Sequence, residues 1–519
     1  MRHFANLGKK LGDCKRKSFG GVTLKSRNKA DSSIYILVLV FLAFFISLQD
    51  VCSPISKRIN YSDGSIYQYL GHLITIGRMP YVDAFDHKGP LLYLLNALSL
   101  TFGRKGVWFV DLLFILTYTI VSYAIARQFL NSRWAFCIST LSVTALSNVY
   151  WIGNTPDWYT SIAILTVVFL SSKYFLTGNL SSASITIIGI SIAFCFWQKF
   201  TTIGVIGIYC VSILITNFIS HPTDIKFIVR CILYCFLGFA IVSVPIILWL
   251  WHQNALSAMA SDYFLFSTQY GTDAVSLSEK SKAFSFFLSD KLIVLSQCAF
   301  IFEVAALWIL KAICKEDLTN KNFADIRLLY TTEIALLVQG IVNALPGRAY
   351  VQYKCTLYPC AFVEICIGLK LVLKFASMRK SLCQRILAII IAIVVCGNIN
   401  VATTNQLALT GDASKQSVEE LATIKLYLHS GEKLAVASPD DAGLYLWTET
   451  ESATTYPYIQ ADMYGNTTFW KEYNRQLKAN HPKVIVWATN WDVNYYLDIE
   501  LLKKYEAINM GRLLVLVNE

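Results

Sequence analysis

Residues 77–95, GRMPYVDAFDHKGPLLYLL, join a charged turn to the start of an apolar segment. Five ionisable side chains lie within eleven positions of this stretch: Arg78, Asp83, Asp86, His87 and Lys88. A further carboxylate, Asp63, lies just upstream in YSDGSIY (61–67). Apolar sequence surrounds both motifs, so this concentration of charge needs a topological or functional explanation.

The composition is typical of a membrane protein. Of the 519 residues, 55% are hydrophobic and 15% are charged, whereas soluble chains carry about 25% charged residues. Long apolar runs recur between residues 34 and 402, and a helix of about 20 apolar residues spans a bilayer. The sequence therefore predicts an all-α polytopic protein of the plasma membrane, in contact with membrane lipids.

The N-terminal residues 1–31 form a basic arm. Nine Lys or Arg residues and one Asp occur in the first 30 positions. Basic segments that flank a first span remain in the cytoplasm, so we expect the N-terminus inside and residues 32–51 to form the first membrane helix. A role in setting the membrane orientation and contact with anionic lipid headgroups explain the basic charge of the arm better than a nucleic-acid partner does.

The apolar run at 90–103 is about 14 residues long and ends in GRKG, which is short for a span. Two interpretations follow: a helix in the outer interface or a short span. The second would put the basic clusters at 311–327 and 374–385 outside, against the positive-inside rule. The interfacial interpretation is therefore preferred, and 52–106 becomes an outer loop with interfacial helices.

This interpretation divides residues 32–402 into about 11 transmembrane helices. They are expected at 32–51, 107–126, 134–151, 158–176, 184–198, 200–219, 231–251, 292–312, 328–345, 355–373 and 386–402. The arrangement puts Asp63, the turn around His87 and Asp157 on the same outer face.

Residues 403–519 differ from the rest of the chain. They carry 10 Lys or Arg and 15 Asp or Glu, a net charge of −5, within a chain of net charge +11. KLAVAS, KVIVWAT and RLLVLV predict short buried strands, and SVEELATIKLYLH and NTTFWKEYNRQLKAN predict amphipathic helices. None of the 14 cysteines lies here. We expect a small extracytoplasmic α/β domain without disulfides.

Two carboxylates in one outer loop indicate acid–base chemistry or cation binding, although a solvated loop is the simpler alternative. Gly77, Pro80, Gly89 and Pro90 restrict the loop geometry. Two further segments expected on the same face also carry charge: GNTPDW (153–158) contains Asp157, and GRAYVQYK (347–354) contains Arg348, Tyr350 and Tyr353.

The order of YSDGSIY, GRMPYVDAFDHKGPLLYLL, GNTPDW and FWQKFTTIG (196–204) resembles that in membrane glycosyltransferases of the GT-C type. The nearest resemblance is to the bacterial branch of protein O-mannosyltransferases and lipid A aminoarabinose transferases, over residues 34–402. It implies a GT-C-like catalytic domain at 32–402. It also implies inverting transfer of a hexosyl or pentosyl group from a polyprenyl-phosphate donor to an extracytoplasmic glycan, lipid or protein.

The resemblance also implies roles for individual residues. Asp63 would act as general base, and Asp86 and His87 would orient the acceptor or the leaving phosphate. Asp157 matches the second outer-loop carboxylate, and a divalent cation, Mg or Mn, could bridge it to Asp63; no cofactor is certain. The expected substrate-binding residues are Lys88, Lys199, Arg348, Tyr350 and Tyr353. Gln352 departs from the pattern, because some relatives have His there.

Structural alternatives exist for several of these residues. Asp63 and Asp157 could cap helices, Lys199 could extend from a helix end to the interface, and Tyr350 and Tyr353 could be interface aromatics. Glu303 and Glu333 fall within predicted spans, where ionisable groups are functional or paired.

Two other functions compete with the enzyme. One is a transporter or flippase for a lipid-linked glycan, and the other is a non-catalytic scaffold on the same fold. A transporter places charges near the middle of its spans and often contains an inverted repeat. Here the charges gather in the outer loops, and the sequence shows no such repeat. The pattern therefore favours a glycosyltransferase.

Overall fold

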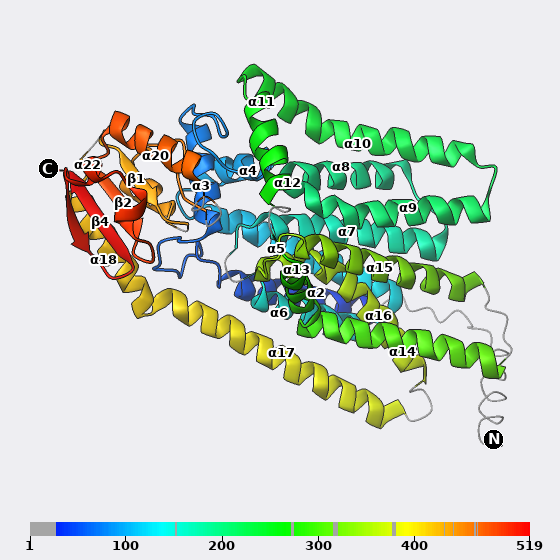
Figure 1. The fold of residues 1–519 in the computed structure, drawn as a ribbon. Coiled ribbons are helices and arrows are strands. Elements are labelled where there is room, and N and C mark those ends of the chain that lie inside the picture. Colours follow the sequence, from blue (N-terminus) through cyan, green and yellow to red (C-terminus); the bar gives the residue numbers. More distant parts are fainter. Residues whose placement is uncertain are drawn as a thin grey trace.

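The computed structural model describes residues 27–150, 153–270, 275–314, 320–375, 380–429, 431–439, 441–460, 463 and 466–518. Long helices run beside one another in a bundle (Figure 1). A small sheet domain formed by the C-terminal residues lies at one end of this bundle, next to the short helices α3 (Asp63–Thr75) and α4 (Pro90–Leu100). This is the predicted helical membrane fold with a small C-terminal α/β domain.

Eleven helices of the described chain correspond to the eleven predicted spans. They are α2 (Arg27–Ser47), α5 (Val107–Phe129), α6 (Ser132–Ala145), α7 (Pro156–Thr177), α8 (Ser182–Lys199), α9 (Ile203–Ser220), α10 (Ile225–His252), α14 (Lys291–Cys314), α15 (Asn320–Ala344), α16 (Tyr358–Phe375) and α17 (Lys380–Thr410). By length and hydropathy alone, five segments of the described residues can cross a membrane, or six if the bent pair Leu277–Leu288 and Lys291–Ala306 is one span.

One of these five segments, Ser182–Ser220, contains both α8 and α9. The backbone of Lys199 is extended (φ −158°, ψ 94°) and separates the two helices. Ile185 near the start of α8 and Ile213 near the end of α9 line the same apolar cavity. The two helices therefore run in opposite directions, as two predicted spans should.

The short apolar run after the charged turn forms α4, which has 11 residues and begins with Pro90 at its first position. At 1.5 Å per residue this helix is about 16 Å long, roughly half the thickness of the hydrocarbon core. A Cβ atom on Gly71 of α3 would lie 2.7 Å from the backbone nitrogen of Ala97. The glycine thus allows α3 and α4 to pack closely at the end of the bundle.

The C-terminal sheet has the order β1-β2-β4-β3, formed by β1 (Leu434–Ala437), β2 (Val484–Ala488), β4 (Leu513–Asn518) and β3 (Tyr505–Asn509). β1 and β2 are parallel, and β4 is antiparallel to both β2 and β3. The predicted helices are α18 (Asp412–Leu426) and α20 (Thr467–Asn480). The strand β3 is not predicted by the hydrophobic pattern, because it is an edge strand with no fully buried residue.

The C-terminal domain packs directly against the first outer segment. Phe85 N donates to the carbonyl of Thr455 at 2.7 Å, and Ser452 N donates to the Tyr69 hydroxyl at 2.8 Å. The rings of Tyr69 and Tyr445 stack with centroids 4.4 Å apart. These contacts join residues nearly 400 positions apart and hold the C-terminal domain beside the cavity described next.

Candidate active site

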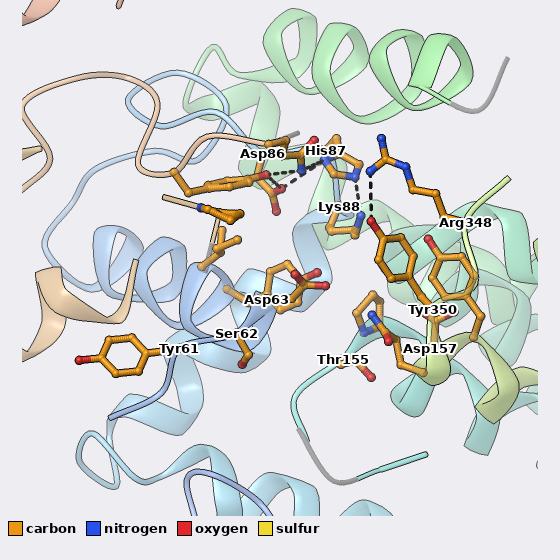
Figure 2. A pocket seen from close by; sticks show the side chains of 18 residues that line it. Tyr61, Ser62, Asp63, Asp86, His87, Lys88, Thr155, Asp157, Arg348 and Tyr350 are labelled. Atoms are coloured by element: carbon orange, nitrogen blue, oxygen red, sulfur yellow. Dashed lines mark hydrogen bonds and ion pairs between the residues drawn. The ribbon is translucent and has the colours of Figure 1, made fainter. Parts of the chain in front are cut away.

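A cavity of about 450 Å³ lies where the helical bundle meets the C-terminal domain (Figure 2). Four segments line it: the first outer segment, the start of α7, the loop before α16 and the C-terminal domain. The lining residues are Tyr61, Ser62, Asp63, Ile66, Tyr67, Asp86, His87, Lys88, Thr155, Pro156, Asp157, Arg348, Tyr350, Gln352, Tyr353, Pro439, Tyr458 and Gln460.

Eight of the nine site residues predicted from the sequence line this cavity. They are Asp63, Asp86, His87, Lys88, Asp157, Arg348, Tyr350 and Tyr353. The ninth, Lys199, lies behind the wall and contacts Asp157 and Tyr353. The structure also adds residues that the sequence did not single out, above all Tyr458 and Gln460 of the C-terminal domain.

Asp63 is the first residue of α3, and Ser62 occupies the N-cap position. Among the described residues, no side chain or backbone group bonds to the Asp63 carboxylate. Burial raises the pKa of this carboxyl above its ordinary value; Lys88 opposes the shift, and Asp86 and Asp157 add to it. A raised pKa suits a general base that works near neutral pH.

Neither Asp63 nor Asp157 is an N-cap residue, which was the structural alternative for both. The N-cap of α7 is Thr155, whose hydroxyl accepts from Trp158 N at 3.3 Å, and Asp157 lies two positions further on. Both carboxylates nevertheless lie in a first helical turn, where the helix dipole stabilises negative charge.

Asp86 is 1% exposed and has both carboxylate oxygens occupied. Tyr93 donates its hydroxyl to Oδ2 at 2.6 Å, and Tyr458 donates to Oδ1 at 2.6 Å. His87 Nδ1 is 3.5 Å from Oδ1. With one donor already on each oxygen, Asp86 is less available as a base than Asp63, so the geometry favours a role in positioning His87.

His87 lies between Asp86 and Lys88. Its Nε2 atom is hydrogen-bonded to the Lys88 ammonium. An ammonium only donates, so Nε2 accepts and the proton is on Nδ1, facing Asp86. Burial, helped by Lys88, Lys199 and Arg348, lowers the pKa of His87 well below its ordinary value. The imidazole is therefore neutral and holds the Lys88 side chain at the cavity wall.

The backbone of this turn is fixed against the end of α8. Gly89 N donates to the carbonyl of Gln198 at 3.0 Å, and Tyr81 donates its hydroxyl to the carbonyl of Lys88 at 2.7 Å. A Cβ atom on Gly89 would lie 2.0 Å from the carbonyl oxygen of Trp197. Glycine is thus required where the turn meets α8.

Lys199 forms a buried ion pair with Asp157 at 2.7 Å, and the side chains are 14% and 3% exposed. Its ammonium also lies 3.5 Å from the centre of the Tyr353 ring. Lys199 does not extend to the interface, so that alternative is wrong. Its charge is already compensated by Asp157, which makes the predicted contact with a substrate phosphate unfavourable.

Arg348 and Tyr350 lie on the side of the cavity near Lys88 (Figure 2). Arg348 Nη1 donates to the Tyr350 hydroxyl at 3.1 Å. Two cationic side chains, Lys88 and Arg348, thus line the cavity that also contains the Asp63 carboxylate. Lys354 from the same loop instead lies 3.5 Å from Asp290.

The residues present are a poor fit for a metal ion. Within the described ranges, no group of three or more His, Cys, Asp or Glu side chains could hold one. A cation between Asp63 and Asp157 would have to compete with Lys199 for Asp157. A divalent cation therefore remains an expectation from the sequence that no contact of the described residues supports.

The two glutamates noted within the predicted spans lie away from the cavity. Gln297 donates to Glu333 at 3.0 Å, which gives this residue a partner. Glu303 is 1% exposed, and neither of its carboxylate oxygens has a hydrogen-bond partner among the described residues.

No protein-family model and no curated protein sequence matches the chain. Solved structures do match. ArnT from Cupriavidus metallidurans in the apo state has a TM-score of 0.61 and 14% identity, covering 94% of this chain and 98% of that chain. The same protein bound to undecaprenyl phosphate has a TM-score of 0.58, 13% identity and the same coverage.

A second match is the archaeal oligosaccharyltransferase AglB from Archaeoglobus fulgidus, in complex with an inhibitory peptide and a dolichol-phosphate. Its TM-score is 0.53 at 13% identity, covering 95% of this chain and 75% of that chain. ArnT and AglB are both GT-C glycosyltransferases, so the resemblance noted in the sequence is confirmed at the level of the fold. This chain has the GT-C fold of membrane glycosyltransferases, with a small C-terminal sheet domain that completes the wall of its cavity.

Proposed function

We propose that the protein is a membrane glycosyltransferase. It would transfer a hexosyl or pentosyl group from a polyprenyl-phosphate donor to a hydroxyl group of an extracytoplasmic glycan, lipid or protein, with inversion. One observation carries the proposal: a single cavity at the end of the membrane helices combines the Asp63 carboxylate with the cations of Lys88 and Arg348.

The proposed chemistry uses these groups in one displacement. Asp63 accepts the proton of the acceptor hydroxyl while its oxygen forms a bond to the anomeric carbon of the sugar. The bond from that carbon to the phosphate oxygen breaks, and the electron pair leaves on the polyprenyl phosphate. Lys88 and Arg348 offset the developing phosphate charge. Attack opposite the leaving phosphate inverts the anomeric configuration.

The position of the cavity supports a lipid-linked donor. The site lies where helices of membrane-spanning length end, so a polyprenyl chain could remain in the bilayer while its phosphate enters the cavity. Two matched proteins of the same fold were solved with undecaprenyl phosphate and with a dolichol-phosphate. Such a phosphate is already a good leaving group, so the enzyme mainly needs a base and cations.

A transporter is the second candidate, because Glu303 is buried within the bundle without a hydrogen-bond partner among the described residues. Intramembrane carboxylates are frequent in ion pathways. The two functions differ in which residue they need. An enzyme of the proposed mechanism needs Lys88, and a transporter that moves protons or ions along the bundle needs Glu303.

The decisive experiment is transfer by the purified protein, supplied with a panel of polyprenyl-phosphate sugars and a crude envelope fraction as acceptor. We expect transfer from one donor, with inverted anomeric configuration by NMR. Lys88→Ala should reduce both donor affinity and turnover, whereas Glu303→Gln should transfer at the wild-type rate. Loss of transfer in Glu303→Gln with full activity in Lys88→Ala would contradict the proposal.

A further inference from the structure

The C-terminal domain contributes two side chains to the cavity, Tyr458 and Gln460. Tyr458 is 1% exposed, so its phenol is part of the wall and not a mobile surface group. Its hydroxyl donates to Asp86 Oδ1 at 2.6 Å, although the two residues are 372 positions apart. The same hydroxyl accepts from Gln460 Nε2 at 2.9 Å.

The amide of Gln460 reaches the next residue of the turn. Its Nε2 atom lies 3.1 Å from His87 Nδ1. Both atoms carry protons when Nε2 of His87 accepts from Lys88, so this is a packing contact, and Gln460 acts through its hydrogen bond to the Tyr458 hydroxyl. Tyr93 donates to the other oxygen of Asp86. Asp86 thus receives one phenol from its own segment and one from the C-terminal domain, and His87 has neighbours from both parts of the chain.

The segment that carries Tyr458 is held on both sides. Thr455 accepts from Phe85 N at 2.7 Å, and its own N donates to Gln476 Oε1 of α20 at 2.7 Å. Upstream, Ser452 N bonds to the Tyr69 hydroxyl of α3. Backbone bonds to α3, to the charged turn and to α20 therefore set where the Tyr458 ring lies.

These contacts form a relay from the C-terminal domain to Lys88. Tyr458 and Tyr93 hold the Asp86 carboxylate, Asp86 faces Nδ1 of His87, and Nε2 of His87 accepts from the Lys88 ammonium. Without the Tyr458 hydroxyl, Oδ1 of a buried carboxylate would lose its closest donor. Asp86 and the imidazole could then reorient, and Lys88 would no longer be held at the wall.

We propose that Tyr458 and Gln460 are positioning residues, through which the C-terminal domain sets the orientation of Lys88 for the phosphate of the donor. The idea rests on the proposed function for what Lys88 binds. It makes the active site a composite of the bundle and the C-terminal domain.

The test compares two tyrosines two positions apart. Tyr458→Phe removes the hydroxyl that bonds Asp86. Tyr456→Phe is the matched control, because the Tyr456 ring packs against Phe85 but, within the described chain, no hydrogen bond of its hydroxyl is found. Because Lys88 is held through this hydrogen bond to a charged group, its loss should weaken binding of undecaprenyl phosphate, used as probe, by up to about 10- to 100-fold. The control should bind like wild type.

A second readout does not depend on transfer. Lys88 in the wild type is hydrogen-bonded to His87, so reductive methylation followed by mass spectrometry should modify it slowly. Tyr458→Phe should speed this modification, and Tyr456→Phe should not. Gln460→Met, which keeps Tyr458, should have a smaller effect of the same sign. If the wild type transfers no sugar but these differences appear, the function proposed above fails while the relay stands.

Coupling to Asp86 separates positioning from general destabilisation. If Tyr458 acts through Asp86, adding Tyr458→Phe to Asp86→Asn should weaken probe binding no further. Equal probe binding and equal Lys88 methylation in Tyr458→Phe, Tyr456→Phe and wild type would overturn the proposal. So would strictly additive effects in the double variant.

Discussion

Lys199 places its ammonium 2.7 Å from a carboxylate oxygen of Asp157, and both side chains are largely buried. The pair connects the last residue of α8 with the first turn of α7. A buried charge that loses its partner destabilises a protein by about 3–5 kcal/mol, whereas replacing both partners by neutral groups is often tolerated. The pair is thus a structural link, and Asp157 is less available as a base than Asp63.

This pairing predicts a compensating double substitution. Lys199→Met should lower the apparent unfolding temperature in detergent, because it leaves Asp157 buried without its cation. Lys199→Met combined with Asp157→Asn should recover most of the loss. Unfolding followed by tryptophan fluorescence measures both effects. A double variant less stable than either single variant would show that the ion pair is not the source of the effect.

Asp63→Asn should slow transfer strongly. The amide keeps the shape of the carboxylate but cannot accept the acceptor proton, and loss of a general base typically costs about 10²–10⁴-fold in rate. Donor binding should change little, because the cations that face the phosphate remain. Asp83→Asn is the control: Asp83 is in the same outer segment, is exposed, and does not line the cavity. Wild-type transfer by Asp63→Asn would refute this mechanism.

The pH dependence of transfer should reflect the environment of Asp63. Burial raises its pKa above the ordinary 3.8, and the base is active when deprotonated. The value of kcat/KM should therefore rise with pH through an apparent pKa above 3.8. Lys88 lowers the pKa of Asp63. In Lys88→Met the residual activity should therefore rise with pH at a higher pH than in the wild type. If this rise occurs at the same pH in Lys88→Met and in the wild type, Asp63 is not the base.

Chelation tests the cation interpretation of the two carboxylates. Asp157 is held by Lys199, and a bridging cation would have to displace that ammonium. We expect transfer by the purified protein to persist in excess EDTA. Activity that disappears on chelation and returns with Mg²⁺ or Mn²⁺ would show instead that a cation takes the place of the ion pair during the reaction.

Local patterns in the sequence predicted much of this structure. The motifs around Asp63, His87, Asp157 and Arg348 were recognisable because each puts charge beside an apolar run, and all four reach one cavity. Tyr458 carries no such signal, because tyrosine is common in small folded domains and its partner is 372 residues away. Its role is a property of how the C-terminal domain packs.

Lys199 shows a second limit of sequence reasoning. A lysine at the end of an apolar run has the same appearance whether it reaches solvent, a phosphate or a buried carboxylate. Only the approach of α8 to α7 shows that its partner is Asp157. The edge strand β3 was missed for a different reason: it has too few buried residues to produce a hydrophobic pattern.

The expected orientation in the membrane rests on the distribution of charge, and labelling tests it. The basic arm and the clusters at 311–327 and 374–385 are expected inside. The C-terminal domain lies at the cavity end of the bundle, opposite the α9–α10 connection (Figure 1). Single cysteines on a cysteine-free background should be placed where side chains are exposed: Val82 and Tyr495 at the cavity end, which are 49% and 79% exposed, and Thr223 at the other.

A membrane-impermeant maleimide added to intact cells should label Val82→Cys and Tyr495→Cys, and should label Thr223→Cys only after the membrane is opened. Labelling of both Val82→Cys and Tyr495→Cys would also support an interfacial α4. If residues 90–103 spanned the membrane, every later segment would lie on the opposite side relative to Val82. Labelling of Thr223→Cys in intact cells, with protection of Tyr495→Cys, would put the C-terminal domain in the cytoplasm. The extracytoplasmic acceptor would then have to be abandoned.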